Sequence, residues 1–507
     1  MSRRDAGLLN AHSRRRKIIA TCHPLLAALF LAVPGPSPSR VPIRPVAPPT
    51  ASTLPHRLII LSDIEADPDD TQSFVRVLLY SNEIAIEGMI ATTSTHMRTK
   101  IHPDSIRRIV DAYGLVQPRL ALHDRRYPAA ALLRARIGSG QPVYGMAGVG
   151  PGRDTDGSNR IIAALKLDDP RPLWVAVWGG ANTLAQALFT IRETMPAAAA
   201  AQLISRLRVY TISDQDDSGA WLRRTFPDLF YVVSPGGYDN GTWGGINQRI
   251  DGIDNTTVSN GWLASNIQQG HGPLGAAYPD VAYGMEGDTP SFLALIPNGL
   301  NAPDHMDWGG WGGRYELYLP TLADLDPKGF TGGVPVEPET RPIWTNAVDV
   351  YAPLQTKDYG RATLLDTKTF KGFRVGLWRW RDDFQNDFAA RMRWTTHDPA
   401  DANHAPVVRL GQPDRLTVRS GESFVLDASG STDPDGDSLS FVWFHYPEAG
   451  SWRAPISAGG AANLSHVMFK APDVSKAETA HFIVRVADKG NPPLARYARV
   501  IVTILPE

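Results

Sequence analysis

The sequence predicts an α/β protein whose mainly parallel sheet has flanking helices and is followed by a C-terminal Ig-like β-sandwich. At 507 residues and 43% hydrophobic composition, the chain is long and apolar enough for two or more globular domains. In its first part, apolar runs of strand type alternate with segments of helical periodicity, which indicates parallel strand, helix, strand units. After residue 400, short alternating runs are separated by Gly, Pro and Asp turns, a pattern typical of a β-sandwich.

The α/β domain is expected to span residues 57–325. Its first strand is the apolar run 57–63, and the segment 69–83 then places apolar residues on one face of a helix. The run 84–94 follows as a second buried strand, and a unit of this length predicts a right-handed parallel crossover. Further strand-type runs stand at 171–180 and 205–214. The expected strand ends carry Asp, Thr, Gly and Ser, and ligands bind at such ends in open parallel sheets.

Beyond this domain the sequence predicts two more regions. Residues 326–403 are expected to form a helical and irregular extension packed on the α/β domain. Residues 404–507 contain roughly seven short strand-type runs in about 100 residues, among them LSFVWFHY and HFIVRVAD, and are expected to form the sandwich.

The N-terminal segment has the organisation of an export signal. The basic run 14–17 precedes the apolar run 18–33, and a Pro- and Ser-rich stretch follows. We therefore expect a signal peptide at 1–40, a Pro-rich linker at 41–56, and a secreted or periplasmic mature protein. A membrane anchor is the weaker alternative, because the apolar run falls short of the roughly 20 residues that span a bilayer. No later run comes near that length, so no membrane span is expected after signal removal.

The charge balance argues against a nucleic-acid partner. Lysine and arginine number 51 and aspartate and glutamate 52, which gives a formal net charge of −1. Such a chain has no basic field with which to hold a phosphate backbone. The single cysteine, Cys22, lies inside the apolar run of the signal, so the mature chain is expected to have no disulfide.

The densest group of chemically active side chains is Asp63-Ile-Glu-Ala-Asp67-Pro-Asp69-Asp70, directly after the first expected strand. Carboxylates at this density repel one another unless they are solvated or hold a cation. Carboxylate oxygens select a hard ion, and calcium is favoured over magnesium when protein groups supply most of the ligands. The alternative is an exposed acidic turn in which Asp69 and Asp70 complement the dipole of the next helix.

Two of these segments resemble a known superfamily. IILSDIEADPDD with the following EGMIATTS is similar to the opening of the nucleoside hydrolases, and VAVWGGANTLAQAL is similar to their second motif. The turn departs from the usual Asp-Pro-Gly-x-Asp-Asp. With EGDTPSFLALIPNGLN, DHMDWGGWGGRYE, WRWRDDFQNDFAARMRWT and the sandwich, the chain more closely resembles secreted bacterial cellulose-binding proteins with a nucleoside-hydrolase-like domain. The resemblance covers about residues 57–507.

The resemblance implies roles for individual residues. Asp69 and Asp70 match the paired aspartates, of which one holds sugar hydroxyls and the other calcium. Asp63 matches the residue that binds the metal and deprotonates water, and Glu65 and Asp67 are its rivals because the turn is longer. The further residues implied are the Trp178 main-chain carbonyl as a metal ligand, Asn182 as a substrate contact, Asp288 as the late metal ligand, and Glu286 as its alternative and a substrate contact.

The acid that would protonate the leaving group is not identified by the resemblance, because no histidine directly precedes Asp288. His305 and His96 are distant candidates, and an ordinary polar or packing role is the alternative for each.

Tryptophans supply a second candidate feature. Trp308 and Trp311 lie among glycines and are expected to offer flat faces to a sugar ring. Burial in the core is the alternative for them and for the cluster Trp378, Trp380 and Trp394. In the sandwich, calcium binding at the acidic turn has a solvated hairpin as its alternative; the residues concerned are Asp433, Asp435 and Asp437.

Two functions follow from these features. The first is an exported, metal-dependent N- or O-glycosyl hydrolase that uses calcium and takes a carbohydrate or a nucleoside-like ligand. The alternative is a polysaccharide-binding protein, for cellulose among others, that keeps the fold without turnover. The sequence leaves open whether the protein forms a homo-oligomer.

Overall fold

The structure is a computed structural model that describes residues 54–235, 242–325, 334–357, 361–364 and 368–507. The expected signal peptide and most of the linker lie outside these residues. Residues 54–507 form one compact unit. Within the described part of the chain, no helix combines the length and apolar character needed to cross a bilayer.

The main sheet has eight strands in the order β3-β2-β1-β4-β5-β6-β8-β7, and every neighbouring pair is parallel except β7 with β8. The prediction of a mainly parallel sheet is therefore confirmed. The sheet continues past residue 325, because β8 comes from the expected extension. The strands are β1 (His56–Ser62), β2 (Ile84–Ala91), β3 (Ile137–Ser139), β4 (Leu173–Val177), β5 (Leu207–Thr211), β6 (Phe230–Val233), β7 (Tyr315–Tyr318) and β8 (Ile343–Asn346).

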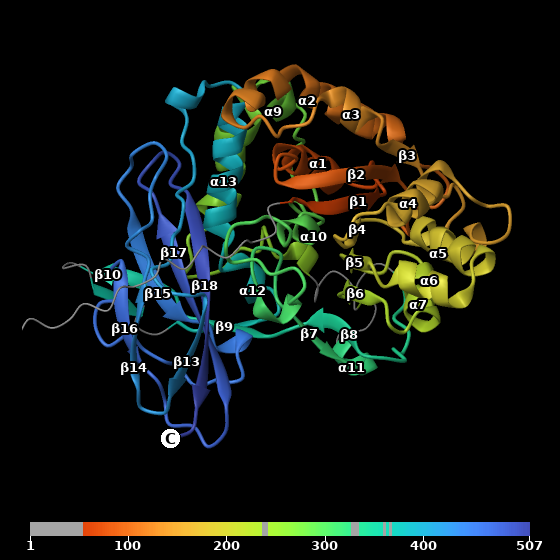
Figure 1. Ribbon diagram of the computed structural model, residues 1–507. Helices are drawn as coiled ribbons and strands as arrows, with labels where there is room; N and C mark the ends of the chain where they lie inside the picture. Colours follow the sequence, from red (N-terminus) through yellow and green to blue (C-terminus); the bar gives the residue numbers. More distant parts are fainter. Residues whose placement is uncertain (1–53, 236–241, 326–333, 358–360, 365–367) are drawn as a thin grey trace, which may run out of the picture. The chain divides into compact units, whose positions relative to one another are not determined.

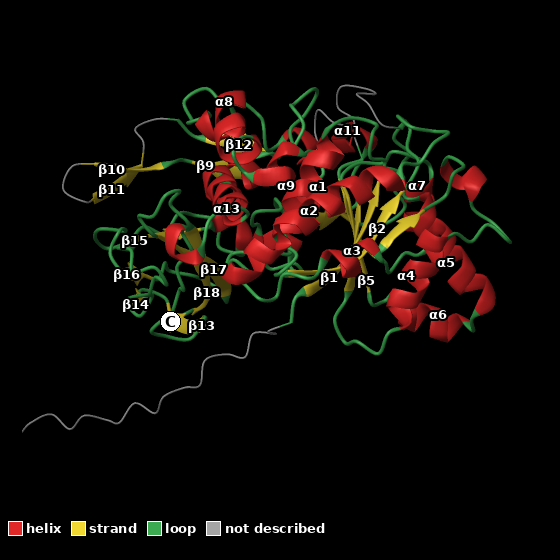
Figure 2. Ribbon diagram, turned by 90° about the horizontal axis from the view of Figure 1, so that it is seen from above, coloured by secondary structure: helices red, strands yellow, loops and turns green. Residues whose placement is uncertain are grey.

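Helices cover both faces of this sheet, as Figure 2 shows. Because side chains alternate along a strand, β1 sends Leu58 and Ile60 into one hydrophobic core and Ile59 and Leu61 into the other. The first core includes residues of α1 (Asp69–Leu79), α2 (Pro103–His123), α9 (Gly272–Ala276), α10 (Pro290–Leu293) and α13 (Arg381–Trp394). The second includes residues of α4 (Asp156–Lys166), α5 (Asn182–Thr194), α6 (Ala197–Ile204) and α7 (Ser218–Thr225). The remaining helices are α3 (Ala130–Arg134), α8 (Asn260–Leu263), α11 (Leu322–Leu325) and α12 (Val375–Trp378).

The strand order reverses between β1 and β4. The chain moves outward from β1 to β2 and β3, and then crosses back to β4 on the other side of β1. In open α/β sheets, ligands bind beyond the carboxyl ends of the strands at such a reversal. The segments that follow β1 and β4 therefore meet at the position where this fold class places its ligand.

The C-terminal region consists of a four-stranded sheet, β13-β18-β17-β15, and a two-stranded sheet, β14-β16, drawn in blue in Figure 1. Inward-facing side chains such as Leu426, Trp443 and Phe482 form their common core. The predicted β-sandwich is confirmed. Its strands are β13 (Arg415–Arg419), β14 (Ser423–Asp427), β15 (Ser440–His445), β16 (His466–Lys470), β17 (Glu478–Ala487) and β18 (Ala495–Leu505).

Between the main sheet and the sandwich in the sequence, the chain forms two small antiparallel strand pairs, which precede α12 and α13. Their strands are β9 (Asp349–Tyr351), β10 (Leu354–Lys357), β11 (Arg361–Leu364) and β12 (Phe370–Gly372). Helix α13 packs against α1 and α2, and its Asp383 also forms an ion pair with Arg485 of β17. This helix therefore contacts both the α/β layer and the sandwich.

Candidate functional site

A cavity of about 490 Å³ opens beyond the carboxyl ends of β1 and β4. It brings together residues that are far apart in the sequence, and five of them are aspartates. The lining residues are Asp63, Ala66, Asp67, Asp69, Asp70, His96, Trp178, Gln215, Trp243, Tyr283 and Asp288. The four aspartates singled out as metal or catalytic residues therefore share one cavity, although the last of them lies more than 200 positions after the others.

Asp63 and Asp70 line this cavity and are almost fully buried. Asp63 follows β1 directly and is 3% exposed, and Asp70 in the first turn of α1 is 2% exposed. Ser62 donates its hydroxyl hydrogen bond to Asp70, and its oxygen also accepts the main-chain N–H of Ile64. The last residue of the strand therefore fixes the geometry of the turn that carries both carboxylates.

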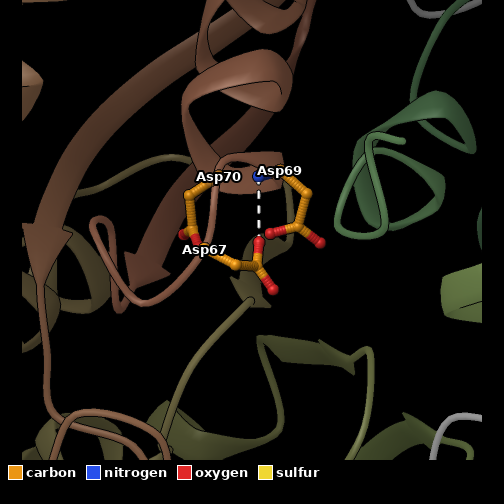
Figure 3. Close-up of side chains that lie close together, drawn as sticks. All are labelled: Asp67, Asp69 and Asp70. Carbon is orange, nitrogen blue, oxygen red and sulfur yellow. Dashed lines mark hydrogen bonds between the residues drawn. The ribbon is translucent and has the colours of Figure 1, made fainter. Parts of the chain in front are cut away.

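Asp67 and Asp69 complete the acidic turn. The carboxylate of Asp67 accepts the main-chain N–H of Asp69 at 2.9 Å, the contact drawn as a dashed line in Figure 3. Carboxylate oxygens of these two residues and of Asp70 lie within 4.8 Å of one another. The side chain of Asp69 is buried and that of Asp67 is partly exposed.

Asp288 approaches from the segment that leads into α10. Its main-chain carbonyl accepts hydrogen bonds from the N–H and the hydroxyl of Ser291, at 3.1 and 2.6 Å. The Ser291 hydroxyl oxygen in turn accepts the indole N–H of Trp178 at 2.8 Å. The end of β4 is thus connected to the loop of Asp288. One carboxylate oxygen of Asp288, Oδ2, is buried and has no hydrogen-bond partner.

The electrostatics of the site follow from burying like charges together. Burial raises the pKa of Asp63 to about 7. Burial, followed by the charge of Asp63, raises the pKa of Asp70 well above its usual range. Burial and the charges of Asp69 and Asp70 have the same effect on the pKa of Asp288. The fully ionised cluster is therefore costly unless a cation compensates it.

The Gly-Gly turn after β4 permits the close approach of these segments. A Cβ atom at Gly179 would lie 2.7 Å from the Cβ of Asp63, and one at Gly180 would lie 2.6 Å from the Thr93 carbonyl. Trp178, the residue before this turn, donates its main-chain N–H to Leu61 at 2.7 Å. Its main-chain carbonyl, expected as a metal ligand, accepts the side-chain amide of Gln215.

Two residues expected to contact substrate do not line the cavity. Asn182 is fully buried at the start of α5, where its side chain donates to the Thr93 hydroxyl and the Val143 carbonyl at 3.0 and 2.8 Å. Glu286 is also fully buried, and it is paired with Arg76. Because a carboxylate held in a buried ion pair is not presented to a ligand, the structure does not support Glu286 as a substrate contact.

The predicted sugar-binding tryptophans also lie elsewhere. The Trp311 side chain has no exposed surface, and its ring packs edge-on against Phe384 and Tyr497. Trp308 stacks on His305 with ring centroids 3.9 Å apart. A fully buried ring offers no face to a sugar, so the prediction for Trp311 is wrong and its core alternative holds. Trp308 is partly buried, but it does not line the cavity.

Of the remaining candidate residues, some line the cavity and one does not. His96 lines the cavity, and burial lowers its pKa. Glu65, considered as a rival to Asp63, lines no part of the cavity and forms an ion pair with Arg108 at 2.8 Å. Asp67, the other rival, does line it.

In the sandwich, the carboxylate of Asp433 accepts the main-chain N–H groups of Asp435 and Asp437 at 2.9 and 3.0 Å. These contacts belong to a turn between β14 and β15, and because those strands lie in different sheets the turn is not the hairpin given above as the alternative.

Sequence reasoning missed three polar or aromatic residues of the cavity: Gln215, Trp243 and Tyr283. Gln215 belongs to SDQDDS, which directly follows β5, and a polar segment after a parallel strand is a signal that could have found it. Trp243 lies in a single 3₁₀ turn, Thr242–Gly244, and Tyr283 in an irregular segment, so neither belongs to a periodic pattern. Trp243 donates its indole N–H to Asp69 at 2.7 Å.

The fold and this cavity define a class: an α/β protein with an aspartate site at the reversal point of a parallel sheet. Residues 57–315 match the family model described as cellulose-binding Sde182, nucleoside hydrolase-like domain. Residues 423–504 match that of the cellulose-binding protein Sde0182, C-terminal domain. The chain belongs to this family of nucleoside hydrolase-like proteins.

A solved structure supports the same assignment. A nucleoside hydrolase-related hypothetical protein from Saccharophagus degradans, described as associated with carbohydrate metabolism, is 33% identical to the chain with a TM-score of 0.72. The match covers 89% of this chain and 100% of that protein. The comparison with curated proteins gave no match.

Two further solved structures are partly similar. The PKD domain of the KIAA 1837 protein is 23% identical over 20% of this chain and 86% of its own, with a TM-score of 0.15. The effector protein XOO4466 is 14% identical over 58% of this chain and 88% of its own, with a TM-score of 0.26. Neither adds to the assignment.

Proposed function

We propose that the aspartate cavity binds a carbohydrate together with a divalent cation, calcium, and that it hydrolyses a glycosidic bond. The observation that carries the proposal is the burial of Asp63, Asp70 and Asp288 against one cavity. Burial, and after it the charges of neighbouring aspartates, raises the pKa values of these carboxylates, which is the property expected of a donor set that lacks its cation. Binding of cellulose or a related glucan is consistent with the description of the family.

The donor set suits calcium. Oxygen atoms are its preferred ligands, and buried carboxylates supply both the oxygens and the compensating charge. The residues that would hold the cation are Asp63, Asp70 and Asp288, with the Trp178 main-chain carbonyl once the Gln215 amide turns away from it. The unpartnered Oδ2 of Asp288 supports this assignment, because a buried carboxylate oxygen is costly without a partner. A bound cation would supply charge compensation and activate water at this position.

Side chains of the cavity would bind the sugar and transfer the protons that the reaction requires. Asp63, which directly follows β1 and lines the cavity, would accept a proton from the attacking water. Asp69 would accept hydrogen bonds from sugar hydroxyls. His96 lines the same cavity and is the residue that would protonate the leaving group. Because burial lowers its pKa, only a minor fraction of the imidazole carries the proton for this step near neutral pH. His305 is stacked on Trp308 and lies outside the cavity.

The test combines binding and turnover. Purified protein is titrated with calcium and then assayed with cellotetraose, other β-glucan oligosaccharides and a panel of nucleosides. We expect Asp70→Asn to abolish calcium binding and turnover, and we expect Glu65→Gln, a carboxylate of the same turn outside the cavity, to leave both intact. Sugar binding without cleavage of any substrate would favour the non-catalytic binding function. The absence of both binding and cleavage would contradict the proposal.

We further propose that the mature protein is exported. A protein that binds an insoluble polysaccharide needs to meet it outside the cytoplasm, and the basic and apolar runs of residues 14–33 are consistent with a signal. The test is N-terminal sequencing of the protein recovered from the periplasm or culture medium. Recovery of a mature N-terminus between residues 35 and 45 is expected, and intact Met1 in the cytosol would contradict it.

A further inference from the structure

Trp243 occupies a slot in the cavity wall that two glycines make possible. A Cβ atom at Gly287 would lie 2.1 Å from Cδ1 and 2.2 Å from Nε1 of the indole, and one at Gly284 would lie 2.7 Å from Cζ2. Any larger residue at these positions would therefore displace the ring. One side of the indole is set by main chain, while the ring itself is partly exposed and lines the cavity.

The polar edge of this indole is fixed on a carboxylate of the site. Trp243 Nε1–H donates a hydrogen bond to Asp69 Oδ2 at 2.7 Å. A Cβ at Gly287 would also lie 2.6 Å from this oxygen, so indole, carboxylate and glycine meet at one point. The main-chain N–H of Asp69 is bound by Asp67. The indole N–H therefore holds one oxygen of the Asp69 carboxylate in a defined position.

A second aromatic residue extends the same wall. Tyr283 directly precedes Gly284, is 78% exposed, and lines the cavity with Trp243. The cavity therefore combines carboxylates that accept hydrogen bonds with aromatic surface. A sugar ring has both complementary features, because its hydroxyls donate hydrogen bonds at the edge and its C–H groups form an apolar face. A small inorganic anion would be repelled by the carboxylates and would make no use of the aromatic wall.

We propose that Trp243 determines the sugar specificity of the cavity: its ring is the platform for a neutral sugar ring with vicinal hydroxyls, and its N–H positions Asp69 to receive those hydroxyls. This inference rests on the sugar-binding part of the proposed function. It replaces Trp311 with Trp243 as the tryptophan that meets carbohydrate. Trp243 is a positioning residue with respect to Asp69 and a contact residue with respect to the sugar.

Two substitutions separate the two roles. Trp243→Phe keeps an aromatic ring and removes the N–H, and we expect it to weaken binding of cellotetraose roughly tenfold through the loss of the hydrogen bond that positions Asp69. Trp243→Ala also removes the platform and is expected to weaken it by roughly a hundredfold or more. Trp262→Phe, at a partly buried tryptophan of α8 outside the cavity, is the matched control and should bind cellotetraose like the unaltered chain. Affinities are measured by calorimetry in buffer containing calcium.

A spectroscopic measurement on the unaltered chain provides an independent readout. In a spectrum of ¹⁵N-labelled indole groups, the Trp243 signal is identified as the one missing from Trp243→Phe. We expect this signal to shift when cellotetraose is added and the Trp262 signal to stay in place. A purely structural role for Trp243 would not produce that difference.

The outcomes distinguish this inference from the proposed function. If Asp70→Asn abolishes calcium binding and Trp243→Phe and Trp243→Ala both retain full affinity for cellotetraose, the role of Trp243 is wrong and the metal site stands. If inosine binds at the cavity and no glucan oligosaccharide does, the neutral sugar platform is overturned in favour of a nucleobase. If the calcium-induced rise in melting temperature is preserved in Trp243→Phe while cellotetraose affinity falls, both the fold and the inference are supported.

Discussion

Arg76 and Glu286 form an ion pair that is completely buried behind the aspartate cavity. Arg76 belongs to α1, whose first turn carries Asp69 and Asp70, and Glu286 stands two positions before Asp288. The guanidinium Nε lies 2.5 Å from one carboxylate oxygen of Glu286. The pair therefore connects the two segments that bring the acidic side chains together.

The first prediction concerns this pair. Arg76→Met leaves a buried carboxylate without its partner, and Glu286→Gln leaves a buried guanidinium, so each should lower the free energy of unfolding by about 3 to 5 kcal/mol. The double variant should lose much less than the sum of the two, because neither charge is then left alone. Urea unfolding of the four proteins measures this coupling. Strictly additive losses would mean that the two side chains do not interact.

The second prediction concerns Asp288. Because like charges at Asp69 and Asp70 contribute to its raised pKa, Asp288→Asn should relieve repulsion and raise the melting temperature in the presence of a chelator at pH 8. The same variant should lose most of the stabilisation by calcium, which amounts to about 2.7 kcal/mol at a hundredfold excess over the dissociation constant. Glu65→Gln is the control. A lower chelated melting temperature with an unchanged calcium effect would contradict the assignment.

The parts of the site that sequence could predict are those with a local pattern. Asp63 follows an apolar strand and Asp69 begins the periodic helix after it, so both lie at the carboxyl edge of the sheet where the strand order reverses. The Gly-Gly turn after β4 could be predicted in the same way, because it also follows an apolar strand. The structure gives the reason for the glycine, since a side chain at Gly179 would have no room beside Asp63.

The rest depends on packing between distant segments. Trp243 reaches Asp69 across 174 positions, and only the glycine slot explains its placement. Trp311 stands in a glycine-rich turn that suggests an exposed platform, but it packs on Tyr497, which lies 186 positions further along. These contacts cannot be inferred from the residue type or from the neighbouring residues in the sequence.

The third prediction separates these tryptophans. Trp311→Ala removes a fully buried ring and should lower the free energy of unfolding by about 3 to 5 kcal/mol. The fraction of Trp311→Ala that stays folded should bind cellotetraose with unchanged affinity. Trp243→Ala should instead lose affinity for cellotetraose and keep its free energy of unfolding. Thermal unfolding and calorimetry on both variants check this. A selective loss of sugar affinity in Trp311→Ala, with unchanged stability, would restore that residue to the binding site.

The last prediction concerns acid sensitivity of the sandwich. Burial lowers the pKa of His445 to about 4 and of His481 to about 3. Each ring accepts a hydrogen bond at Nδ1, from the Ile456 main-chain N–H at 3.3 Å and from the Arg499 guanidinium at 3.1 Å, and a protonated ring would lose that acceptor. Both histidines are therefore neutral in the folded protein throughout the range in which an unfolded histidine, with a pKa of about 6.5, takes up a proton.

The sign of the effect follows from this proton balance. Between pH 6.5 and 4 the unfolded chain binds more protons at His445 and His481, so acidification through this range lowers the free energy of unfolding. From pH 7 to 5 the loss should be roughly 2 kcal/mol for each histidine. The aspartates of the cavity act in the opposite direction, because their pKa values are raised, so the comparison is made between variants. His445→Gln with His481→Gln should lose less stability on acidification than the unaltered chain, as measured by urea unfolding at both pH values. Equal losses would show that these histidines are already protonated in the folded sandwich at pH 5.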